Sequence, residues 1–76
     1  MYILSSDGKT LLKADKLSVQ KNFGGKKEQK YAIVAEGKND LIAVVAAVFS
    51  DEKFAVDALE KAFRAFADGA KFYKFD

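Results

Sequence analysis

The strongest constraint on the fold is an uninterrupted apolar run of nine residues, from Leu41 to Phe49, in the middle of a short chain. Hydrophobic periodicity alone cannot separate a buried strand from a buried helix in such a run. The turn signal at residues 37–40 and the β-branched residues within the run favour a strand. Its alanines keep a helix as the alternative. A strand that is apolar on both faces needs cover on both sides.

The segment that follows this run predicts an amphipathic helix from Asp51 to about Asp68. Ser50 is a suitable N-cap, and acids occupy the first turn, where the helix dipole favours them. Gly69 suits the C′ position that ends many helices. These signals predict both ends of the helix independently of its hydrophobic pattern.

The two faces of this predicted helix differ in width. At about 100° per residue, its charged side chains fall on one narrow arc: Lys53, Asp57, Glu60, Lys61, Arg64 and Asp68. Phe63 and Phe66 lie in the remaining apolar arc, where we expect them to be buried. Phe49 and Phe54 occupy the positions of a hydrophobic staple. The apolar arc is wider than contact with one sheet requires.

Five further segments have the alternation or the bounding turn signals of strands. They are Tyr2–Ser5, Thr10–Lys13, Leu17–Phe23, Lys30–Glu36 and residues 70–76. Asp7-Gly8 predicts a hairpin between the first two. The expected order is β-β-β-β-β-α-β. It defines an α+β fold: an antiparallel β-meander of about five strands, curved or partly closed, with one amphipathic C-terminal helix and a short final strand. The 76 residues predict a single domain, 1–76.

Composition excludes most catalytic and metal chemistry. The chain has no Cys and no His, so the usual nucleophiles, general bases and zinc ligands are missing. Asp7, Asp15 and Asp40 fall in turns, and Asp51 and Glu52 fall in the first turn of the helix, where capping and the helix dipole account for them. We therefore expect no enzyme activity, no metal and no cofactor. Lack of cysteine and of any long apolar segment is typical of a cytoplasmic protein without a membrane span.

Charge is distributed unevenly along the chain. Residues 1–38 hold 8 Lys against 4 acids, a net charge of +4, whereas residues 39–76 hold 5 Lys or Arg against 7 acids. The basic half contains a cluster of lysines around the pair Gly24-Gly25. Nucleic acid is not expected as its partner, because Glu28 lies within the cluster and Arg is absent from it.

Within this cluster, the candidate ligand-binding residues are Lys26, Lys27, Lys30 and Tyr31. Ammonium groups and an aromatic ring together suit a small anionic ligand that carries a base. Lys30 and Tyr31 point to opposite faces of their predicted strand, so one strand cannot place both side chains on the same ligand. Sheet curvature or a second protomer would have to supply the other group. The alternative is a solvated loop whose lysines protect a sheet edge from pairing.

The surplus of apolar surface predicts a partner. One helix covers one face of a sheet, and small domains without disulfides or metals often gain stability by oligomerisation. We expect a non-catalytic binding protein that forms a homo-oligomer and sequesters a small anionic, nucleotide-type ligand. The alternative is a protein–protein interaction module or inhibitor that uses the surplus apolar face on a host protein.

Three stretches also carry a resemblance. The opening, residues 1–9 with its Ser6-Asp7-Gly8 turn, and the stretches 49–53 and 65–73 resemble small uncharacterised proteins of Gram-positive bacteria and their phages. In those proteins a strand, a Ser-x-Asp-Gly turn and further strands precede an acid-capped helix and a short final strand. The resemblance implies this fold and no site residues. A phage or mobile-element origin would suit a role in counter-defence, by analogy alone.

Overall fold

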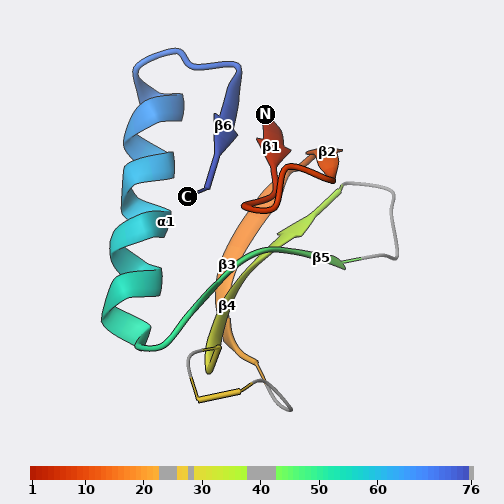
Figure 1. Cartoon of the computed structure of the whole chain (residues 1–76). Coiled ribbons are helices and arrows are strands. Elements are labelled where there is room, and N and C mark those ends of the chain that lie inside the picture. Colours follow the sequence, from red (N-terminus) through yellow and green to blue (C-terminus); the bar gives the residue numbers. More distant parts are fainter. Residues whose placement is uncertain (23–25, 28, 38–42, 76) are drawn as a thin grey trace.

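The computed structural model describes residues 1–22, 26–27, 29–37 and 43–75 and confirms the α+β class (Figure 1). Its elements follow the predicted order: β1 (Tyr2–Leu4), β2 (Leu11–Lys13), β3 (Lys16–Lys21), β4 (Tyr31–Glu36), β5 (Ala43–Phe49), α1 (Glu52–Ala67) and β6 (Phe72–Lys74). The apolar run is thus a strand over its described part, and residues 41–42 lie outside the described residues. In the described part, no helix is long and apolar enough to cross a membrane.

The strands divide into two three-stranded sheets. Sheet A has the order β2-β1-β6, in which β1 pairs antiparallel with β2 and parallel with β6. Sheet B is an antiparallel meander with the order β3-β4-β5. Helix α1 contacts all three strands of sheet B and also β6, so it bridges the two sheets (Figure 1). The final strand therefore returns to the start of the chain.

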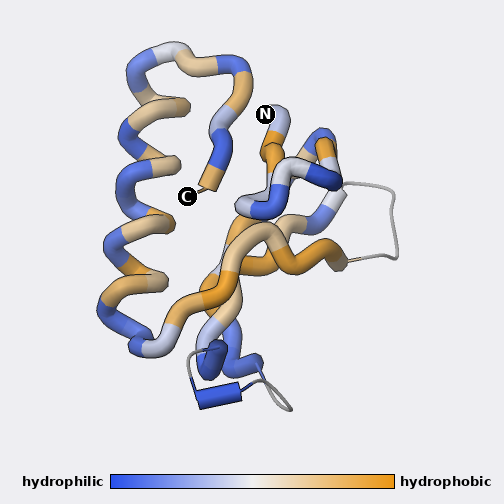
Figure 2. The backbone as a smooth tube through the Cα atoms, in the orientation of Figure 1, coloured by the Kyte–Doolittle hydropathy of each residue, from blue (hydrophilic) through white to orange (hydrophobic). Residues whose placement is uncertain are grey.

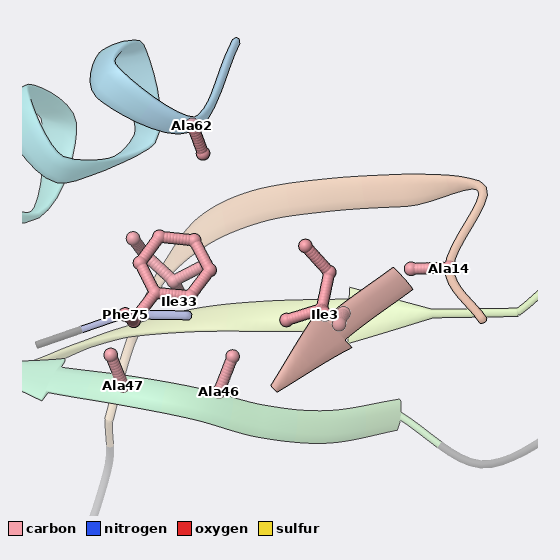
Figure 3. Close-up of a cluster of buried hydrophobic side chains, with 8 residues drawn as sticks. Ile3, Ala14, Ile33, Ala46, Ala47, Ala62 and Phe75 are labelled. Carbon is pink, nitrogen blue, oxygen red and sulfur yellow. The ribbon is translucent and has the colours of Figure 1, made fainter. Parts of the chain in front are cut away.

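A bulge in β5 turns two successive alanines toward the core. Ile33 is paired with Ala47 and Val34 with Val45, so Ala46 is the extra residue on β5. Both Ala46 and Ala47 are buried and point to the same side of the strand (Figure 3). The Ala46 carbonyl accepts a hydrogen bond of 2.8 Å from the Ser6 amide, which ties β5 to the loop after β1.

The core between the sheets and α1 is built mostly from small residues. Ala55 and Ala62 of α1 are fully buried, and Ala62 points toward sheet B (Figure 3). Phe75 follows β6 and places its ring beside Ile33, between α1 and β5 (Figure 3). Tyr73 continues this packing, because its ring lies 5.1 Å from that of Phe75. Figure 2 shows hydrophobic residues along sheet B and alternation of polar and apolar residues along α1.

The ends of α1 follow the predicted chemistry with one shift. The N-cap is Asp51, whose carboxylate accepts a 3.0 Å hydrogen bond from the Lys53 amide, so the expectation of Ser50 is wrong by one residue. Asp also caps well, because its oxygen reaches the N2 amide. At the other end Gly69 has φ +100°. Its amide bonds to the Phe66 carbonyl and that of Ala70 to the Ala65 carbonyl, which is a Schellman motif.

The loop between β1 and β2 is longer than the tight two-residue turn expected from Asp7-Gly8. Gly8 has φ +74°, and its amide donates to the Ser5 carbonyl. The Asp7 carboxylate accepts hydrogen bonds from the Ser5 hydroxyl at 2.5 Å and from the Lys9 amide at 2.9 Å. The hydrogen bond from Ser5 lowers the pKa of Asp7. The Asp7 carboxylate is thus occupied within this loop.

Candidate functional site

One side of α1 carries large apolar residues, of which Val56 and Phe63 are largely exposed. Phe63 is 69% exposed and Val56 is 45% exposed. The prediction that Phe63 is buried is therefore wrong. Leu59 and Phe66 are half-buried and pack against the core cluster. The spacing of these four residues is three, four and three, the a/d spacing of a helix that packs against another helix.

These residues form one wall of an apolar groove of about 470 Å³, which we call the α1 groove. Its lining residues are Met1, Leu17, Val56, Leu59, Glu60, Phe63 and Phe66. Six of the seven are apolar, and Glu60 is the charged exception. Such a groove offers mainly apolar burial to a ligand or partner.

The opposite flank of α1 carries a smaller groove. It has a volume of about 250 Å³ and is lined by Phe49, Phe54, Asp57, Ala58, Lys61, Tyr73 and Phe75. Phe49 and Phe54 thus lie beside one groove, although Asp51 as the N-cap places neither at the N′ or N4 position of a hydrophobic staple. At 100° per residue, Phe54 and Val56 lie on opposite flanks of the helix.

The outer face of sheet B is a second apolar surface. Ala32, Val34, Val45 and Val48 share this face by register, and none of them belongs to the core cluster. Val45 is 49% exposed. The neighbouring positions on β3 are polar, Ser18 and Gln20. Ala32 and Val34 are themselves buried, so the exposed part of this face lies along β5, and no charged side chain occupies these paired positions.

The predicted ligand-binding residues lie just before β4 and at its first position. Lys26, Lys27 and Lys30 are exposed, whereas Tyr31 is half-buried at the start of β4. Tyr31 pairs with Phe49, on the face of sheet B that carries Ile33 and packs against α1. None of the four residues lines the α1 groove or the groove beside Phe54. The Gly24-Gly25 pair lies outside the described residues.

Within the described ranges, His, Cys, Asp and Glu side chains do not gather in threes as a metal site requires. No protein-family model, curated protein or solved structure matches the chain. The resemblance to small Gram-positive and phage proteins therefore stays a prediction. The function has to be argued from the surfaces alone.

Sequence reasoning missed the α1 groove for a specific reason. The spacing of Val56, Leu59, Phe63 and Phe66 is visible in the sequence, and their arc is wider than contact with one sheet requires, but the pattern does not show which part of the arc meets the sheet. Met1 and Leu17, which complete the groove, come from segments far away along the chain. Leu17 reaches the groove because α1 packs across β3.

Proposed function

We propose that this protein is a non-catalytic interaction module that binds an apolar helix in the α1 groove, and that this helix is α1 of a second copy. The observation that supports the proposal is Phe63, a large aromatic side chain that is 69% exposed in the wall of an apolar groove. Residues of this type bury more apolar area than any other when an interface forms.

The spacing along α1 favours a helix as the occupant. Val56, Leu59, Phe63 and Phe66 repeat as the a and d positions of a heptad. At 1.5 Å per residue this row extends over about 15 Å, which is long enough to contact two to three turns of a partner helix. An extended peptide would instead require an exposed strand edge with free backbone groups.

A second copy fits because the surface is complementary to itself. Phe63 projects from the same groove whose floor is formed by Leu59 and Phe66. In a two-fold arrangement with antiparallel helices, each Phe63 enters the groove of the other protomer, so both copies gain the same contacts. Oligomerisation also supplies the stability that a small domain without disulfides lacks.

This proposal favours the protein-interaction alternative over sequestration of a nucleotide by the loop lysines. Sequestration needs Lys26, Lys27 and Lys30 to meet Tyr31, and the three lysines are exposed before β4, whereas Tyr31 is half-buried at its start. A host protein with an apolar helix could also occupy the α1 groove. The experiment below distinguishes the two occupants, because the purified sample contains no host protein and the chain can assemble there only with further copies of itself.

Sedimentation velocity of the purified chain at low micromolar concentration tests the proposal. We expect an assembly of two chains for the unaltered protein and a single chain for Phe63→Glu, because a carboxylate in the groove has to be desolvated. The matched control is Phe54→Glu, which places the same charge at an exposed position on the opposite flank of α1. Far-ultraviolet circular dichroism verifies that both variants keep the fold.

Two results would contradict the proposal. A monomer for the unaltered chain at this concentration would exclude the second copy as the occupant. If Phe54→Glu dissociated the assembly as fully as Phe63→Glu, the α1 groove would not be the specific contact. Either the chains would associate through another surface, or a negative charge at any position on α1 would prevent assembly.

A further inference from the structure

The outer face of sheet A gathers aromatic and basic side chains from both ends of the chain. In register, β2, β1 and β6 form two rows on this face: Lys13–Tyr2–Phe72 and Leu11–Leu4–Lys74. The residues between these rows, Ile3, Leu12 and Tyr73, belong to the core or pack against it. The six residues of the two rows are called the sheet A face below.

The two aromatic residues of the sheet A face have large solvent-exposed fractions. Phe72 is 72% exposed and Tyr2 is 44% exposed. They are direct neighbours across the parallel pair β1–β6, so their backbones lie about 4.8 Å apart. The nearby Phe75 is 1% exposed and already supplies the aromatic ring of the core. Two adjacent, solvent-facing rings are a typical stacking surface for bases.

The charge around these rings is positive. Lys13 is paired with Tyr2 and Lys74 with Leu4, and the two rows contain no acid. The segments that build sheet A, residues 1–13 and 71–75, hold four lysines (Lys9, Lys13, Lys71 and Lys74) and one acid, Asp7. The Asp7 carboxylate is engaged by Ser5 and Lys9 within its loop. A ligand on this face therefore meets ammonium groups beside aromatic rings.

We infer that the sheet A face binds single-stranded nucleic acid, with bases stacked on Tyr2 and Phe72 and phosphates beside Lys13 and Lys74. A purely apolar partner would desolvate both lysines without compensation. A duplex keeps its bases stacked on one another, so it cannot use the two rings. The expectation that nucleic acid is not a partner rested on the lysines near Gly24-Gly25, and it does not extend to a face that exists only in the folded chain.

Fluorescence anisotropy with a labelled oligodeoxythymidylate of about eight nucleotides, within the usual site size of such domains, tests the inference. Three variants are compared with the unaltered chain. Tyr2→Leu/Phe72→Leu keeps the apolar area and removes both π-faces, and Lys13→Gln/Lys74→Gln removes both charges. The matched control, Lys26→Gln/Lys27→Gln/Lys30→Gln, removes three charges from the loop that the sequence singled out.

We expect the leucine variant to lose affinity on the order of tenfold per ring. The Lys13/Lys74 variant should bind more weakly. Two phosphate contacts contribute about −1.4 to the slope of log K against log salt, so loss of both lysines should make the salt dependence shallower by that amount. The loop variant should bind like the unaltered chain. A duplex of the same sequence and free thymidine monophosphate should bind far more weakly than the single strand.

Several outcomes would overturn the inference. They are no binding by the unaltered chain, full affinity of the leucine variant, or loss of binding confined to the loop variant, which would assign the ligand to Lys26, Lys27 and Lys30. Equal binding of the mononucleotide would assign the face to a small nucleotide instead. The inference does not rest on the α1 groove, so Phe63→Glu provides a separate readout for that surface.

Discussion

The two sides of α1 use apolar residues in opposite ways. On the side that faces the sheets, Ala55 and Ala62 are fully buried and present only methyl groups. On the groove side, Val56 and Phe63 are 45% and 69% exposed. Two alanines are therefore fully inside while Phe63 is outside, although Phe66 of the same helix packs against the core. An aromatic residue outside and alanines inside is the reverse of what is expected for a helix that merely covers a sheet.

This difference shows that the core does not require the side chains of Val56 and Phe63, whereas Leu59 and Phe66 contribute to both the core and the groove. Alanines on α1 let the helix approach the sheets closely, and the space between them is filled by Phe75, which the chain brings in after β6 (Figure 3). Because Phe75 already provides the aromatic ring of the core, Phe63 is available for another contact. The exposed aromatic residue is thus better explained by a partner than by folding.

The largest expected effect comes from truncating the residue that fills the core. Phe75→Ala should lower the free energy of unfolding by about 3–5 kcal/mol, because a fully buried ring leaves a cavity. Phe63→Ala should change it by less than about 0.5 kcal/mol in dilute protein, where assembly does not contribute. Urea melts of both variants at low protein concentration measure this. If both variants lost a similar free energy of unfolding, Phe63 would contribute to the core as Phe75 does, and the two sides of α1 would not differ in this way.

Much of α1 could be predicted from the sequence because its signals are local. Asp51, Glu52 and Gly69 act on backbone groups within one turn, so the helix ends within about one residue of its expected bounds. The α+β class and the order of elements were likewise predictable from alternation and turn signals. The strand assignment of the apolar run was confirmed for Ala43–Phe49.

The surfaces could not be predicted because they depend on contacts between distant segments. The helical pattern shows which residues share an arc but not which part of the arc meets the sheet, and so Phe63 was placed in the core. Tyr2 and Phe72 are separated by nearly the whole chain and become neighbours only through the parallel pairing of β1 with β6. The bulge at Ala46 similarly requires knowledge of the register with β4.

A smaller effect is expected from enlarging a residue on the sheet side of α1. Ala62→Leu inserts three carbon atoms into a closely packed contact and should cost about 1–3 kcal/mol. Ala67→Leu, at an exposed position of the same helix, is the matched control and should be within about 0.5 kcal/mol of the unaltered chain. Thermal melts compare the two. If Ala62→Leu were tolerated, the close approach of α1 to the sheets would not be needed.

The smallest effect concerns the charged strip of α1, between its two apolar flanks. The Arg64 guanidinium lies 2.6 Å from the Glu60 carboxylate, and the two side chains are 74% and 53% exposed. A double-mutant cycle with Arg64→Ala and Glu60→Ala should therefore give a coupling of about 0.3–0.5 kcal/mol that decreases with added salt, because water screens an exposed pair. The same coupling is expected in the uncharged Phe63→Ala background, since Arg64 does not line the α1 groove. A coupling above about 1 kcal/mol that disappears in that background would show that assembly buries this pair, and that the contact surface of α1 extends beyond the row from Val56 to Phe66.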